Sequence, residues 1–83
     1  MKGRSKFWGE FQMISNKQVE LSVALNAFRR KYNMSQAELA HICTLYGEPH
    51  KIKFIQTEIS RYERMATAPR AAKYQVLCNV LNI

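Results

Sequence analysis

The sequence predicts an all-α protein, a small bundle of packed helices in a single domain. Three observations lead to this prediction. Apolar residues recur at the three- and four-residue spacing of amphipathic helices in several separate segments. Two of these segments begin with a capping-box pattern, and Gly47 and Pro49 interrupt the chain between segments. A chain of 83 residues can form one small domain but not two.

Residues 1–15 have no clear helical period, so we interpret them as an N-terminal arm that precedes a domain at 16–83. The arm carries a basic tip and an aromatic cluster. The basic tip consists of Lys2, Arg4 and Lys6, and the aromatic cluster consists of Phe7, Trp8 and Phe11.

The first helix is predicted over residues 16–32. Ser15 and Gln18 form a capping-box pattern at its start. An apolar stripe then follows at spacings of four, three and four residues, made of Leu21, Leu25, Phe28 and Tyr32. This spacing places the stripe on one face of the helix, so the face should lie against the core.

The second helix is predicted to begin directly after Ser35, because Ser35 and Glu38 repeat the capping-box pattern. Its apolar residues are Leu39, Ala40 and Cys43. Gly47 is a natural helix C-cap and Pro49 discourages a continuing helix, so residues 46–54 are predicted to form a loop.

The third helix is predicted at about residues 56–65. Ile59 and Tyr62 are three residues apart and can face the core together. The opposite side of this helix is polar and consists of Gln56, Thr57, Ser60 and Arg61. The last helix is predicted to have Pro69 at its first position and to end near Ile83, with an apolar face of Tyr74, Leu77, Cys78 and Leu81.

Charge indicates the class of partner. The chain has 13 Lys and Arg against six acidic residues, all of them Glu, and a net charge of +7. The basic residues are spread along the chain, which suits a folded surface that binds a polyanion such as nucleic acid. No apolar run approaches the roughly 18 residues of a membrane span, and the first residues lack the features of a signal peptide, so we expect a cytoplasmic protein.

Few of the remaining residues favour catalysis or metal binding. The chain has no Asp, no glycine-rich phosphate loop, and no Ser or Cys next to a His in a recognisable arrangement, so we expect neither an enzyme nor a cofactor. Cys43 and Cys78 are expected to be buried, reduced thiols in helices. No paired CxxC accompanies the available metal-binding side chains, so no metal site is expected from His41, Cys43, His50 and Cys78.

Three stretches resemble the lambda-repressor-like helix-turn-helix family, which includes phage Cro proteins and repressors. They are "LNAFRRKYNMSQAELA", "IQTEISRYER" and "PRAAKYQVLCNVLNI", and the resemblance covers residues 21–83 with one break. It implies a bundle of four or five helices whose third helix lies in the major groove of DNA. The break is an extended turn at residues 41–55. The POU-specific domain has a longer turn, and in this respect the chain is similar to it. The segment "TLYG" at residues 44–47 is also similar to the segment of that domain at the same place.

Two residues depart from the family pattern at the ends of the third helix. Met65 stands where a glycine commonly ends this helix in a left-handed conformation, so we expect the helix to run on toward Thr67. Ile55 stands where a polar N-cap would help, so we expect Thr57 or the loop to cap the helix start.

The resemblance and the side-chain chemistry together predict which residues contact DNA. Gln56 can bind the N6 and N7 atoms of adenine, and Arg61 can bind guanine or a phosphate. Thr57 and Ser60 can meet a thymine methyl group or a phosphate oxygen. The predicted phosphate contacts are Gln36, Lys51, Lys53 and Arg64, with His50 beside them, and for each the alternative is a solvated surface residue. The resemblance also implies that Gln36 steadies Gln56.

Two acidic residues of the third helix have expected structural roles. The resemblance implies that Glu63 pairs with Arg29 of the first helix and so holds the third helix against the bundle. Glu58 could accept from cytosine N4, but an acid in the first turn is explained by the helix dipole, and we favour that role.

These expectations lead to a sequence-specific double-stranded DNA-binding transcriptional regulator, a repressor of phage or mobile-element type that binds its operator as a homodimer. The basic tip of the arm would reach the minor groove while its aromatic cluster packs on the bundle. The alternative is an antitoxin-like or anti-activator module that binds a partner protein through the aromatic cluster.

Overall fold

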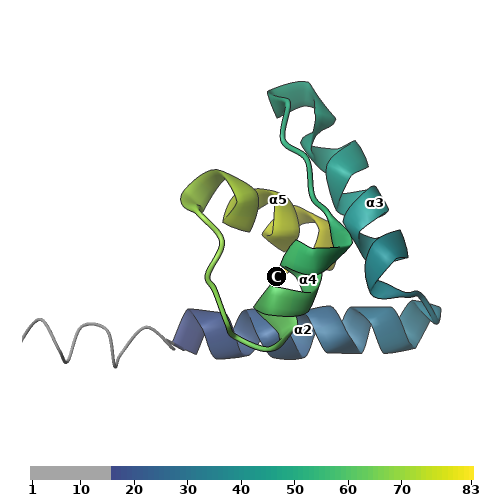
Figure 1. Cartoon of the computed structure of the whole chain (residues 1–83), viewed down its shortest axis with the longest axis vertical. Helices are drawn as coiled ribbons and strands as arrows, with labels where there is room; N and C mark the ends of the chain where they lie inside the picture. Colours follow the sequence, from purple (N-terminus) through teal and green to yellow (C-terminus); the bar gives the residue numbers. More distant parts are fainter. Residues whose placement is uncertain (1–15) are drawn as a thin grey trace, which may run out of the picture.

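The computed structural model describes residues 16–83, which form four α-helices and one short 3-10 helix (Figure 1). The elements are α2 (Asn16–Tyr32), α3 (Gln36–Gly47), η1 (Glu48–His50), α4 (Gln56–Glu63) and α5 (Ala71–Leu81). No residue in this range lies in a strand, so the predicted all-α class is confirmed. The N-terminal arm, with its basic tip, its aromatic cluster and the predicted cap Ser15, lies outside the described residues.

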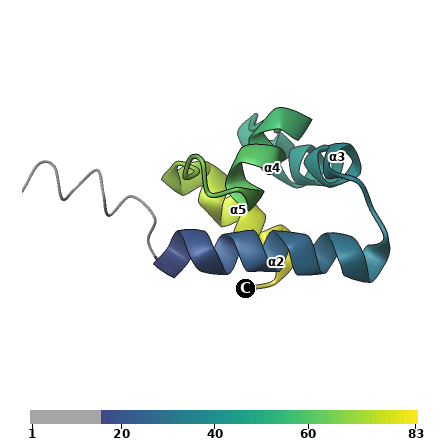
Figure 2. The same cartoon turned by 60° about the horizontal axis from the view of Figure 1, so that its bottom comes forward.

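One core joins all four helices. The long helix α2 lies along one side of the domain, with α4 and α5 packed against it and α3 above it in Figure 2. Helix α4 packs against both α2 and α3, while α5 contacts α3 and α2. The largest fully buried side chains come from every α-helix and are Leu21, Leu25, Leu39, Cys43, Ile59 and Leu77. A short helix such as α4 is therefore held by tertiary packing and not by its own helical propensity.

Helix α2 has the predicted boundaries. Leu21 and Leu25 are buried and Phe28 packs against the core. Tyr32, the last member of the predicted stripe, is 54% exposed, and its ring lies 4.8 Å from that of Phe28. The core therefore covers the stripe only as far as Phe28, and the prediction was wrong for the last turn.

Helix α3 begins with the predicted capping box. The Ser35 hydroxyl accepts a hydrogen bond from the Glu38 N–H at 3.0 Å, and the Glu38 carboxylate accepts from the Ser35 N–H at 2.7 Å. The predicted loop at 46–54 was partly wrong, because α3 continues to Gly47 and η1 follows it directly. Pro49 is tolerated in the first turn of η1, where its missing N–H leaves no hydrogen bond unmade.

Gly47 has a role other than the predicted left-handed C-cap. Its backbone is right-handed, with φ −86°. A Cβ atom at this position would lie 2.7 Å from the Ile52 carbonyl oxygen, closer than real Cβ atoms approach. Glycine is therefore required by close packing of the returning chain. The left-handed turn falls instead on Lys51, with φ 59°.

The end of the turn is fastened to α3 by Thr44. The Thr44 hydroxyl accepts from the Phe54 N–H at 2.8 Å. Its one hydrogen is shared between the Ala40 carbonyl at 2.9 Å and the Phe54 carbonyl at 3.1 Å. The Phe54 side chain is 5% exposed. Phe54, the residue before the N-cap of α4, is thus fixed both by the burial of its side chain and by the hydrogen bonds of its backbone.

The prediction that α4 runs on toward Thr67 was wrong, and Thr57, one of the two caps expected at its start, does not cap it. Ile55 is the N-cap without a side-chain cap from Thr57, and the Glu58 carboxylate accepts from the Ile55 N–H at 3.1 Å. Helix α4 ends at Glu63 because Met65 adopts φ 59°, a conformation that costs a residue with a side chain about 1–2 kcal/mol. Two hydrogen bonds offset this cost. They run from the N–H groups of Met65 and Ala66 to the carbonyls of Tyr62 and Arg61.

Helix α5 begins later than predicted. Pro69 does not take its first position, because Arg70 is an extended N-cap and Ala71 is the first helical residue. The buried face is also rotated from the predicted one and consists of Val76, Leu77, Val80 and Leu81, while Tyr74 and Cys78 are half-buried. Cys43 is buried as predicted, and neither cysteine forms a disulfide. Within residues 16–83, none of the helices combines the length and the apolar character needed to cross a membrane.

Candidate nucleic-acid interface

One side of α4 is polar and faces away from the core. Ile59 is 0% exposed and Tyr62 is 6% exposed, so these two side chains hold the helix against α2 and α3. On the other side, Gln56, Thr57 and Arg61 are exposed and Ser60 is half-buried. The four residues predicted to read bases therefore share the outward surface of one helix. Their binding role stays a prediction.

The start of α3 and the start of α4 are joined by two glutamines. The Gln56 amide Nε2 donates to the Gln36 Oε1 at 2.7 Å. The Gln36 Nε2 donates in turn to the Glu63 Oε1 at 3.0 Å. The predicted contact in which Gln36 steadies Gln56 is present.

The predicted ion pair between Arg29 and Glu63 is also present and has two parallel contacts. The Arg29 Nε lies 2.6 Å from Glu63 Oε2, and Nη2 lies 2.8 Å from Oε1. Such bidentate pairs restrict geometry more than a single contact does. The Glu63 side chain is 6% exposed and that of Arg29 is 24% exposed. The Arg29 guanidinium also donates to the Met34 carbonyl at 3.3 Å, so it holds the turn between α2 and α3 as well as α4.

The charge on Glu63 is stabilised by its neighbours. Burial acts to raise the pKa of Glu63, but hydrogen bonds from Arg29 and Gln36, together with the positive charge of Arg29, outweigh burial and hold the pKa below its ordinary value. The hydrogen bond to Glu63 likewise raises the pKa of Arg29. Glu63 is therefore an anion at neutral pH.

The anionic carboxylate determines which way the two amides point. An ionised carboxylate can only accept hydrogen bonds, so Gln36 must turn its NH₂ group toward Glu63 and its carbonyl oxygen toward Gln56. Gln56 must then offer one N–H to Gln36. Its other N–H and its carbonyl oxygen are free of this contact, and this donor–acceptor pair matches the N7 and N6 positions of adenine.

Helix α4 is held by further polar contacts that the sequence did not indicate. The Ser22 hydroxyl donates to the Glu63 carbonyl at 2.6 Å, which satisfies a carbonyl at the helix end. Glu58 pairs with Lys73 of α5, whose ammonium lies 5.2 Å from the centre of the Phe54 ring. These partners come in addition to the helix-dipole role predicted for Glu58, which lies in the first turn of α4.

The residues predicted to contact phosphates beside α4 flank it in the chain. His50, Lys51 and Lys53 are exposed on the segment that leads to the N-terminus of α4, and Arg64 is exposed at its C-cap with Nε 3.4 Å from the Ser60 hydroxyl. Two further cations lie near Arg61. Arg61, Arg70 and Lys73 all line a cavity of about 240 Å³ between α4 and the start of α5. Arg70 and Lys73 could not be assigned to this place from the sequence, because only the packing of α5 brings them beside α4.

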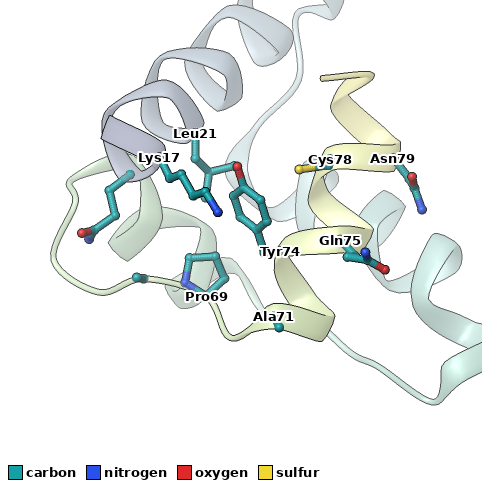
Figure 3. Close-up of a pocket in the computed structure, with 10 residues that line it drawn as sticks. Lys17, Leu21, Pro69, Ala71, Tyr74, Gln75, Cys78 and Asn79 are labelled. Atoms are coloured by element: carbon teal, nitrogen blue, oxygen red, sulfur yellow. The ribbon is translucent and has the colours of Figure 1, made fainter. Parts of the chain in front are cut away.

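A second cavity lies elsewhere on the domain and involves none of the predicted DNA-contacting residues. Its volume is about 610 Å³, and it is bounded by the first turns of α2, the segment after α4, and α5. Figure 3 shows Lys17, Tyr74 and Cys78 around it, with the Lys17 ammonium 5.7 Å from the centre of the Tyr74 ring. Among residues 16–83, no three His, Cys, Asp or Glu side chains are grouped so that they could hold a metal ion.

Comparisons of the chain with protein-family models, with curated proteins and with solved structures found no match, so the resemblance to the lambda-repressor-like family stays a prediction from the sequence.

Proposed function

We propose that this chain is a sequence-specific double-stranded DNA-binding protein that reads the major groove with α4. The observation that carries the proposal is the position of Gln56, which is exposed at the start of α4 and yet held by Gln36. A surface glutamine that served only solubility would not need a chain of hydrogen bonds leading to a partly buried ion pair. Holding the side chain in advance reduces the conformational entropy lost on binding.

The residues that follow Gln56 extend this readout surface. Arg61 is one turn beyond Thr57 on the same exposed side and can make a bidentate contact with guanine. Thr57 and Ser60 offer hydroxyl groups for bases or phosphates. These residue types on one helix face supply both donors and acceptors, which a sequence-specific contact requires.

Phosphate binding would supply most of the affinity. The net charge of +7 favours association with a polyanion. Lys51, Lys53 and Arg64 lie before and after α4 in the chain, and Gln36 retains a second N–H for a phosphate oxygen. Binding should therefore weaken as salt concentration rises.

The biological role follows from the size of the domain. One small module rarely provides enough affinity alone, so we propose that a homodimer binds a two-fold operator with half-sites about 34 Å apart or a multiple of that distance. Occupation of a promoter would repress transcription, in the manner of the phage and mobile-element repressors that the sequence resembles. The protein would then act in the cytoplasm, where such DNA is found. The runner-up, a protein-binding module, depends on the aromatic cluster outside the described residues.

Selection from a random duplex library, followed by footprinting at physiological salt, tests this proposal. We expect one preferred sequence, and we expect Gln56→Ala to relax the preference at one base position by about 1–3 kcal/mol. Gln75→Ala is the matched control, because Gln75 is an exposed glutamine on α5. If Gln56→Ala and Arg61→Ala both bind the operator as wild type does, the assigned interface is wrong. A library without any enriched sequence, together with a stoichiometric protein partner, would support the runner-up.

Lys53 should show a different signature. Lys53→Ala should weaken binding to all duplexes alike and lower the slope of log affinity against log salt by about 0.9, the value for one phosphate contact. Lys31→Ala removes an equal charge from an exposed position at the end of α2 and should change the slope less. Equal slopes for the two variants would remove Lys53 from the interface.

A further inference from the structure

Ile55 occupies the N-cap of α4 although its side chain cannot cap a helix. N-cap positions favour Ser, Thr, Asn and Asp, whose side-chain oxygens accept from N–H groups of the first turn. Ile55 makes no such bond, and its side chain is 60% exposed. The side chain therefore serves neither the helix start nor the centre of the core.

The backbone of Ile55 is nevertheless held on both sides. The preceding residue, Phe54, is fastened to Thr44 through both its N–H and its carbonyl. The Ile55 N–H donates to the Glu58 carboxylate, and the Ile55 carbonyl accepts from the N–H groups of Glu58 at 3.0 Å and Ile59 at 3.3 Å. A β-branched side chain on a fixed backbone has few rotamers. An apolar group is thus presented to solvent in a nearly fixed place.

The place adjoins the proposed base-reading surface. Ile55 directly precedes Gln56, and a recognition helix contacts base edges with its N-terminal residues. The major groove displays one apolar group among its donors and acceptors, the C5-methyl group of thymine. An exposed isoleucine at the tip of such a helix has that methyl group as its complementary partner.

We propose that Ile55 contacts the methyl group of a thymine at or beside the base pair read by Gln56. This inference rests on the proposed function and adds a residue that determines specificity. Ile55 would favour thymine over cytosine and over uracil, which lacks the methyl group. Gln56 would read the polar edge while Ile55 reads the apolar one.

Replacement of thymine by deoxyuridine in the selected duplex is the direct test, because it removes one methyl group and keeps base pairing. Each thymine is replaced singly, and affinity is measured by fluorescence anisotropy for wild type and for Ile55→Ala. At one thymine per half-site we expect the replacement to weaken wild-type binding roughly three- to fivefold, the effect of burying one methyl group. For Ile55→Ala the same replacement should leave the affinity almost unchanged.

Two further variants separate recognition from folding. Val23 is β-branched like Ile55 and is 61% exposed, but it lies on α2. Val23→Ala should therefore keep the full uridine effect. Ile55→Ser supplies a hydroxyl suited to the N-cap, so it should keep a melting temperature close to that of wild type while losing the uridine effect.

The outcomes distinguish this inference from the proposed function. If a sequence is selected but wild type is insensitive to uridine at every position, or Ile55→Ala keeps the wild-type response, DNA binding stands and the methyl contact is overturned. If no duplex is selected, the proposed function fails and the methyl contact falls with it.

Discussion

Glu63 is the residue on which the polar contacts around α4 converge. Its carboxylate accepts from Arg29 and Gln36, and its backbone carbonyl accepts from Ser22. A carboxylate that is 6% exposed needs such partners, since an unpaired buried charge is strongly destabilising. The same contacts orient the amide of Gln56, so one buried anion serves both the stability of the fold and the geometry of the exposed helix.

Removal of Arg29 should therefore cost more than removal of a neighbouring surface arginine. We expect Arg29→Ala to lower the free energy of unfolding by about 2–3 kcal/mol, less than for a fully buried pair because Arg29 is partly exposed to water. Urea denaturation measures this change. Arg30→Ala, an exposed neighbour on the same helix, should change it by about 0.5 kcal/mol or less. Equal effects of the two variants would show that the pair contributes nothing particular.

The turn between α3 and α4 is the element that positions the start of α4. It combines the last turn of α3, the short helix η1 and a left-handed residue at Lys51. Gly47 allows the chain to return against α3, and Thr44 fastens that return at Phe54. Because Phe54 is two residues before Gln56, order in the turn is transmitted directly to the proposed base-reading surface.

A change of Thr44 to valine tests this element. Valine keeps the shape of threonine but removes the hydroxyl, so the half-buried Phe54 N–H loses its acceptor. We expect Thr44→Val to lower the free energy of unfolding by about 1–3 kcal/mol and to speed hydrogen exchange at the Phe54 amide. Thr57→Val makes the same chemical change at an exposed position of α4 and should be nearly neutral. If the Phe54 amide hydrogen exchanges as slowly in Thr44→Val as in the wild type, the role given to the Thr44 hydroxyl is contradicted.

At the scale of the whole molecule, buried ionisable groups limit the pH range in which the fold is stable. Burial raises the pKa of the Cys43 thiol to about 12. Burial, aided by the charges of Glu58 and Cys43, raises the pKa of Tyr62 to about 12. The pKa of Glu63 is instead lowered, because its hydrogen bonds and the charge of Arg29 outweigh burial. The folded state therefore favours the neutral forms of Cys43 and Tyr62 and the charged form of Glu63.

These shifts predict a stability plateau between about pH 5 and pH 8. The folded pKa of Glu63 lies below its unfolded value, so its contribution is present above that unfolded value and is lost as pH falls. The folded pKa values of Cys43 and Tyr62 lie above their unfolded values, so their contributions are present below those values and are lost as pH rises toward 12. Urea denaturation at a series of pH values measures both the loss of stability at low pH, the acid limb, and the loss of stability at high pH, the alkaline limb.

Single variants assign each limb to its residue. Glu63→Gln should flatten the acid limb, and Cys43→Ala should make the alkaline limb less steep, whatever their effects at neutral pH. Cys78→Ala is the control for the alkaline limb, because Cys78 is half-buried beside a cavity and not in the core centre. An alkaline limb that responds to Cys78→Ala and not to Cys43→Ala would overturn the assignment.

Local rules predicted the helices well where the deciding interactions lie close together in the chain. The capping box at Ser35 and Glu38 involves neighbouring residues, and the inward positions of Ile59 and Tyr62 follow from helical spacing. The exposed polar side of α4 was predictable for the same reason, since residues that do not face the core at this spacing must face outward. The ion pair of Arg29 with Glu63 required the family resemblance, because no local rule joins residues so far apart.

The amino-acid sequence by itself determined the all-α class, the approximate places of the α-helices within residues 16–83, and the polar surface of α4, since these depend on periodicity and short-range hydrogen bonds. The tertiary structure decided how the two ends of α4 are held in place. Ser22 of α2 donates to the Glu63 carbonyl at the end of the helix, and Thr44 of α3 holds Phe54 just before the helix start. These contacts join residues 41 and 10 positions apart in the chain, and short-range patterns in the sequence do not contain them.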